Sequence, residues 1–125
     1  FIVDSQTYKK LQKHVEELLT KDIPQEEGTY NILAEYMIHN KNGFGPDYLS
    51  TAEQLVDKAM RIETPNSYKF SIKRSILKMK KAFEEYQEMS DKHIAVLKKE
   101  KPYDGWEEDV ALIKGEMKEI EKTKR

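Results

Sequence analysis

The sequence predicts an all-α fold, a bundle of about five helices organised around a long fourth helix at about residues 67–100, which forms an antiparallel hairpin with the C-terminal helix. Apolar residues recur at intervals of three and four along most of the chain, as on the buried face of a helix. No stretch alternates apolar and polar residues as a half-buried strand does. The charged fraction of 36% and the apolar fraction of 38% are typical of well-solvated helices.

The composition bounds the class of protein. With 125 residues, 22 of them basic and 23 acidic, we expect a single helical domain over residues 1–125. The chain does not begin with Met, which favours a segment of a longer protein. It has no cysteine, which excludes disulfides and thiolate metal sites and favours an intracellular location, cytoplasmic or nuclear. No apolar run is long enough to span a bilayer, so we expect no membrane partner.

Helix-breaking residues delimit the first two helices. The first is predicted at about 5–21, before Pro24. The second is predicted at about 29–40, where the Asn42–Gly43 pair provides a C-terminal stop.

The irregular loop at 40–47 separates the second helix from the third. Neither the spacing of a calcium-binding loop nor that of a phosphate-binding loop fits it, so we expect a turn anchored by Phe44. A recognition loop is the alternative. The third helix begins near Ser50, where Glu53 completes a capping box, and ends before Pro65.

The fourth helix is defined by a continuous seam at heptad-like spacing. The seam consists of Ile72, Ile76, Met79, Phe83, Tyr86, Ser90, His93 and Leu97. We expect any break in this helix at Ser90–Asp91, where a new helix could be capped. The short link at 101–105 predicts the hairpin with a fifth helix that starts near Trp106. Its length predicts that this helix covers only the C-terminal half of the fourth.

Catalytic and metal-binding patterns are missing from the sequence. The three histidines, His14, His39 and His93, lack the partners of a zinc or diiron motif. We expect His93 to be hydrogen-bonded between helices rather than to act as a ligand or an acid–base group. No nucleophile motif is present. We therefore predict no cofactor, no metal and no catalytic residue, and an enzyme with an unrecognised site is the third-ranked function.

The charge pattern points to one surface. Between Tyr68 and Lys81 there are six cations and no acid, and two apolar residues lie between the basic rows of the helical wheel. The predicted partner-binding residues are Lys69, Phe70, Lys73, Arg74, Leu77, Lys78 and Lys81. In the alternative interpretation, Phe70 and Leu77 are buried against a second neighbouring helix and the lysines extend past them into water.

The predicted function follows from this surface. We expect a non-enzymatic helical interaction module, regulatory or adaptor in nature, that binds another protein or an acidic, amphipathic peptide. Binding of nucleic acid by the same cations is the first alternative. A homodimer formed through the helical hairpin is a further alternative.

Overall fold

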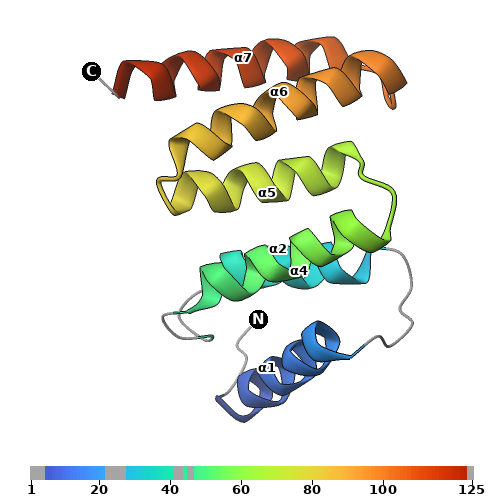
Figure 1. The fold of residues 1–125 in the computed structure, drawn as a ribbon, viewed down its shortest axis with the longest axis vertical. Helices are drawn as coiled ribbons and strands as arrows, with labels where there is room; N and C mark the ends of the chain where they lie inside the picture. Colours follow the sequence, from blue (N-terminus) through green and yellow to red (C-terminus); the bar gives the residue numbers. More distant parts are fainter. Residues whose placement is uncertain (1–4, 22–27, 41–43, 45–46, 124–125) are drawn as a thin grey trace. The chain divides into compact units, whose positions relative to one another are not determined.

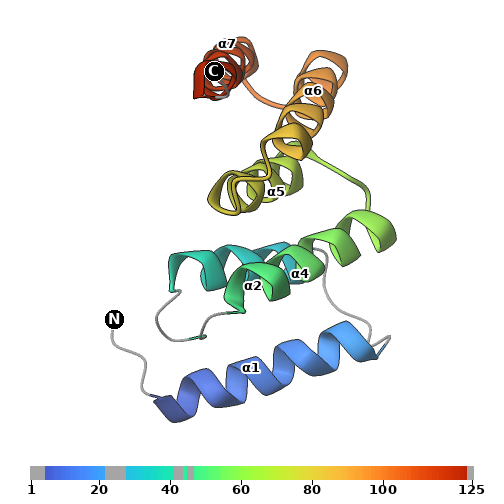
Figure 2. The ribbon, with the colours of Figure 1, turned by 60° about the vertical axis from the view of Figure 1, so that its left-hand side comes forward.

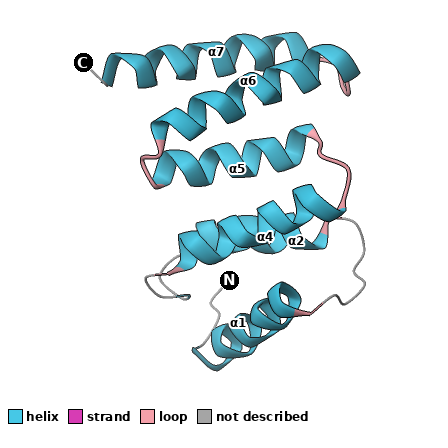
Figure 3. Cartoon of the chain, in the orientation of Figure 1, coloured by secondary structure: helices cyan, strands magenta, loops and turns pink. Residues whose placement is uncertain are grey.

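The chain forms six α-helices within the residues that the computed structural model describes, which are 5–21, 28–40, 44 and 47–123. Figure 3 shows only helices and loops in these residues, so the predicted all-α class is confirmed. The predicted number of about five helices is wrong, because the stretch expected to form the long fourth helix forms two. The chain divides into two compact units, Phe1–Pro65 and Asn66–Arg125.

The first unit consists of α1 (Ser5–Thr20), α2 (Thr29–His39) and α4 (Tyr48–Ile62). α2 and α4 pack against each other, and α1 contacts α4 (Figure 1). The core contains apolar side chains from all three helices: Val15, Leu18, Tyr30, Ala34, Met37, Ala52, Leu55, Val56 and Ala59. Their spacing of three and four is the one that the sequence analysis used, so the pattern identified the buried faces correctly.

Phe44 is buried in this unit between two tyrosines. Its ring makes edge-to-face contacts with Tyr8 of α1, at 5.0 Å between centroids, and with Tyr36 of α2, at 5.9 Å. The expected anchoring by Phe44 is therefore confirmed, whereas residues 41–43 and 45–46 of the predicted turn lie outside the described residues.

A buried lysine closes the C-terminal end of α1. Lys58 of α4 is buried, and its Nζ atom donates hydrogen bonds to the carbonyl oxygens of Leu18 and Lys21. Its ammonium group also lies 5.4 Å from the centroid of the Tyr30 ring. Carbonyls in the last turn of a helix have no partner within the helix, so an ammonium group there stabilises the end of α1.

The second unit consists of α5 (Ser67–Met79), α6 (Phe83–Glu100) and α7 (Trp106–Thr123). α6 packs against both α5 and α7, and the three helices follow one another as successive rods in Figures 1 and 2. Two apolar clusters hold them together. One contains Ile94, Leu97, Val110 and Ile113; the other contains Leu77, Tyr86 and Ile120.

The predicted long helix at 67–100 is interrupted, and the break lies at Lys80–Ala82 rather than at Ser90–Asp91. Lys81 has a left-handed backbone conformation, with φ of 61°. Its N–H donates to the carbonyl of Lys78, and the N–H of Ala82 donates to the carbonyl of Leu77. This pair of bonds is a Schellman motif, a common way to end a helix, here with lysine in the position that usually holds glycine.

The break at Lys80–Ala82 also changes how the C-terminal helix packs against the stretch at 67–100. The predicted hairpin between a helix at 67–100 and the C-terminal helix becomes a packing of α7 mainly against α6, which is only the second part of that stretch. The expectation that the C-terminal helix cannot reach the first half of the long stretch is wrong as well. Ile120 of α7 shares a buried cluster with Leu77 of α5, because the turn at Lys80–Ala82 folds α5 back alongside α6.

Candidate functional site

The second unit contains a groove of about 540 Å³. Its walls come from the N-terminal half of α5, the C-terminal half of α6, the loop between α6 and α7, and the face of α7 from Asp109 to Glu116. This volume lies in the range of sites that bind a ligand or a few side chains of a partner. All lining residues belong to the same compact unit.

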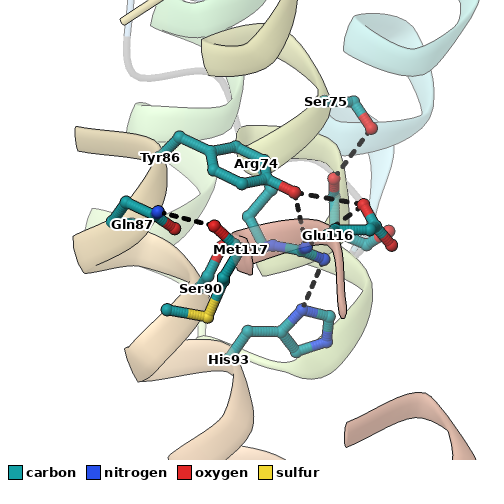
Figure 4. A network of polar contacts seen from close by, with 9 residues as sticks. Arg74, Ser75, Tyr86, Gln87, Ser90, His93, Glu116 and Met117 are labelled. Atoms are coloured by element: carbon teal, nitrogen blue, oxygen red, sulfur yellow. Dashed lines mark hydrogen bonds and ion pairs between the residues drawn. The ribbon is translucent and has the colours of Figure 1, made fainter. Parts of the chain in front are cut away.

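Arg74 of α5 forms the buried centre of one wall, and its guanidinium group donates in four directions (Figure 4). Nε donates to Ser90 Oγ at 2.9 Å, and Nη1 lies 3.4 Å from His93 Nδ1. Nη2 donates to Tyr86 OH at 2.9 Å and forms an ion pair with Glu116 Oε2 at 3.5 Å. The planar fork of an arginine suits several acceptors at once, so these contacts hold the side chain in a single conformation.

Tyr86 and Glu116 complete this network. The Tyr86 hydroxyl donates to Glu116 Oε2 at 3.1 Å, and the ring lies 5.1 Å from the guanidinium carbon of Arg74. Burial raises the pKa of Tyr86 above its ordinary value; Arg74 opposes this effect, and Glu116 adds to it. The hydroxyl therefore stays protonated and acts as a fixed donor between α6 and α7.

His93 of α6 lies between Arg74 and the N-terminus of α5. Its Nε2 atom is 3.0 Å from Ser67 Oγ, and its ring stacks on Phe70 at 6.1 Å between centroids. The prediction that His93 is hydrogen-bonded between helices is confirmed. Burial, followed by the charge of Arg74, lowers the pKa of His93 to about 4, whereas Asp109 and Glu116 act weakly in the opposite direction. The ring is consequently neutral at pH 7.

The protonation of His93 decides what the Ser67–His93 pair can do. Arginine has only donors, so Nδ1 of His93 must accept from Arg74, and the ring proton lies on Nε2. Nε2 then donates to Ser67 Oγ. A serine nucleophile needs a ring nitrogen that accepts its proton, with a carboxylate behind the ring. Here the ring nitrogen is a donor and a cation lies behind the ring, so the pair has the geometry of a structural contact.

Exposed aromatic and apolar side chains surround the groove. Tyr68, Tyr103 and Leu112 line it and are 41%, 43% and 63% exposed. The Tyr103 hydroxyl donates to Asp109 Oδ2, and this hydrogen bond is the main cause of the raised pKa of Tyr103. Large apolar side chains that remain in water around a concave surface are typical of sites that bind a partner.

The seven residues predicted to bind a partner do not form one exposed surface. Phe70 is buried against His93, and Leu77 is buried in the cluster with Tyr86 and Ile120. The structure therefore agrees with the alternative in which these two side chains are buried against a neighbouring helix. The expected apolar strip between two basic rows is not at the surface.

The cations of that prediction are divided as well. Lys69, Lys73 and Arg74 are buried, whereas Lys78 and Lys81 are exposed near the C-terminal end of α5. Of the seven residues, only Arg74 lines the groove. It was predicted to meet acidic groups of a partner, but its donors already have acceptors within the chain.

Sequence reasoning missed the groove, although one signal for it was present. Tyr86, Ser90 and His93 are polar or partly polar residues on the seam of α6, and a buried seam with three such groups requires a polar partner on the facing helix. Arg74 is that partner. The contribution of α7 had no comparable signal, because Asp109 and Glu116 resemble ordinary exposed helix residues in the sequence.

The described residues contain neither a cluster of metal ligands nor a helix that could span a membrane. No group of three or more potential metal ligands is present among them. None of their helices has both the length and the apolar character that crossing a bilayer requires. No protein-family model, curated protein or solved structure matches the chain.

Proposed function

We propose that this protein is a non-enzymatic interaction module, and that a segment of another protein binds in the groove of the second unit. The observation that carries the proposal is the distribution of exposed apolar surface. Six large apolar or aromatic side chains are exposed among the described residues, and three of them, Tyr68, Tyr103 and Leu112, surround this one groove. A partner that covers them removes apolar surface from water, which is the main driving force of association.

The residue types around the groove suit protein recognition. Tyrosine provides a large, rigid contact area with only two side-chain torsions, so little conformational entropy is lost when a partner binds. Tyr103 is also held by its hydrogen bond to Asp109. We therefore expect an apolar or aromatic side chain of the partner to lie between Tyr68, Tyr103 and Leu112.

The wall beneath them is rigid for an independent reason. Arg74 connects α5 to Ser90 of α6 and to Glu116 of α7. A surface that is already ordered loses less entropy on binding than a flexible one, so this network favours affinity.

This proposal differs in location from the surface predicted from the sequence. Lys78 and Lys81 remain exposed, but the apolar residues that were to accompany them, Phe70 and Leu77, are buried. The groove supplies the apolar contact instead. The geometry of Ser67 and His93 supports binding over hydrolysis, because the ring nitrogen that faces Ser67 is a donor.

Site-specific photo-crosslinking tests the proposal. A photoreactive amino acid is placed at position 68, at position 112 or, as a control, at position 88, where Glu88 is exposed on α6 outside the groove. The full chain is then illuminated in an extract of cells that contain it. We expect positions 68 and 112 to crosslink to one continuous segment of the same partner, identified by mass spectrometry, and position 88 to give no such adduct. Equal crosslinking from all three positions, or none from the groove, would contradict the proposal.

A further inference from the structure

The groove carries negative charge. Three carboxylates line it, those of Glu100, Asp109 and Glu116, against the single cation Arg74. His93 adds no charge at neutral pH, because its pKa is lowered to about 4. The lining thus has a formal net charge of −2 near pH 7, in a chain whose total is −1.

The one cation in the lining cannot serve an acidic ligand. Arg74 is 6% exposed, and its donors face Ser90, Tyr86, Glu116 and His93. A carboxylate from a partner would have to displace these acceptors and lose its own hydration. An acidic segment would also meet Glu100 and Asp109 at the rim, where like charges repel.

The three carboxylates, by contrast, can still accept hydrogen bonds from a cationic side chain of a partner. Glu100 is exposed at the last position of α6, and the Glu116 side chain is 35% exposed although it also pairs with Arg74. Asp109 accepts one hydrogen bond from Tyr103 and has further lone pairs. The faces of Tyr68 and Tyr103 are a second feature that suits cations, because an aromatic face attracts an ammonium or guanidinium group.

Resting on the proposed function, we infer that the segment bound in the groove is basic and amphipathic. An apolar anchor lies between Tyr68, Tyr103 and Leu112, and lysine or arginine side chains on either side of it face Glu100, Asp109 and Glu116. This partner has the opposite charge to the acidic peptide predicted from the sequence. The difference arises because Arg74, Phe70 and Leu77 are buried, so the predicted surface, which combined cations with apolar contacts, does not form.

Selection of peptides on the full-length protein tests the inference. A phage-displayed library of random peptides is selected on the wild-type chain and then depleted on the variant Tyr68→Ala/Leu112→Ser, so that only groove-dependent peptides remain. We expect these peptides to combine an aromatic or aliphatic residue with an excess of lysine and arginine over aspartate and glutamate. Calorimetry then measures their dissociation constants.

A matched pair of charge reversals isolates the electrostatic contribution. Glu100→Lys and Glu88→Lys both change an exposed glutamate of α6, but only Glu100 lines the groove. We expect Glu100→Lys to weaken binding of the selected peptides by about five- to tenfold and Glu88→Lys to change it by less than about twofold. Raising NaCl from about 50 mM to about 500 mM should weaken binding to the wild type as well, because salt screens exposed charges.

The outcomes separate this inference from the proposed function. Groove-dependent peptides that show no excess of basic residues, or that bind equally well to Glu100→Lys, would overturn the basic partner and leave the proposed function standing. A library that yields no groove-dependent peptide would overturn both. If sedimentation shows a dimer of the chain that Leu112→Ser disrupts, the occupant is a second copy, and the inference is wrong.

Discussion

At the scale of single residues, Arg74 was predicted to bind a partner at the surface, but it lies in a buried network of hydrogen bonds. Arg74, His93, Ser90 and Tyr86 are spread over twenty positions of the sequence, yet the last three each have a polar atom within hydrogen-bond distance of the Arg74 guanidinium group. The sequence places the last three on one seam, but it does not show that Arg74 faces them. On the helical wheel Arg74 falls in a basic row with Lys78 and Lys81, away from the seam. Pairing at a separation of 12 to 19 residues is invisible without the fold.

The low pKa of His93 predicts a pH-dependent contribution to stability. In the folded chain the pKa of the His93 ring is about 4, and in the unfolded chain the pKa returns to its ordinary value of 6.5. Between these values the unfolded state binds more protons, so stability rises with pH in this window and is lost as pH falls from 6.5 toward 4. The free energy of unfolding should decrease by up to about 3 kcal/mol from this group alone.

Urea denaturation of the wild type and His93→Gln at several pH values measures this contribution. Acidic residues shared by both proteins affect both curves, so the informative quantity is the difference between them. We expect the stability advantage of the wild type to shrink as the pH is lowered from 7 to 4. His14→Gln, which changes an exposed histidine of α1, is the matched control. A wild-type advantage that is constant with pH would contradict the assigned environment of His93.

At the scale of helices, the sequence predicted the faces better than the ends. The seam from Ile72 to Leu97 is helical except at its centre, and most of its members are buried. The break at Lys80–Ala82 was missed because the expected signal for a left-handed C-terminal cap is glycine or asparagine, and Lys81 is neither. The sequence has no glycine at this position, but packing stabilises the turn. Ala82, which follows Lys81, packs against the cluster that contains Leu77.

A glycine at position 81 should therefore stabilise the chain. A left-handed conformation costs an L-residue about 1–2 kcal/mol, and glycine adopts it without that cost, although it loses more backbone entropy on folding. We expect Lys81→Gly to raise the free energy of unfolding by about 0.5–1 kcal/mol, measured by urea denaturation. Lys80→Gly is the matched control; Lys80 has φ of −78°, so glycine there should destabilise. Equal effects of the two substitutions would exclude the assigned turn.

At the scale of the whole molecule, the chain has two compact units, each with buried apolar side chains of its own. The buried clusters around Leu97 and Leu77 contain only residues of the second unit. The composition and the helical periodicity predicted the fold class, but they gave no sign of a division near Pro65, which resembles an ordinary helix end in the sequence. The groove could not be predicted either, because residues of α5, of α6, of α7 and of the loop between α6 and α7 form it together.

The single tryptophan allows the two cores to be probed separately. Trp106 lies in the second unit, beside the cluster of Leu97. Leu55 and Leu97 are both fully buried, one in each unit, and substitution of a buried leucine by alanine typically costs about 2–5 kcal/mol. We expect Leu97→Ala to lower the urea midpoint of Trp106 fluorescence and Leu55→Ala to leave that midpoint nearly unchanged while shifting the far-ultraviolet circular dichroism curve. Equal shifts in fluorescence would indicate one cooperative core.

The hydrogen bond between His93 and Ser67 has one more consequence. The Nε2 proton of His93 lies in a buried ring, and its acceptor Ser67 lines the groove. Such a proton exchanges slowly with water, and its nuclear magnetic resonance frequency depends on the length of the hydrogen bond that it makes. We expect a segment that binds against Ser67 to change this length and so to shift the resonance of the His93 proton. The resonance frequency of the His93 Nε2 proton would then report whether the groove is occupied, without an added probe on the protein or its partner.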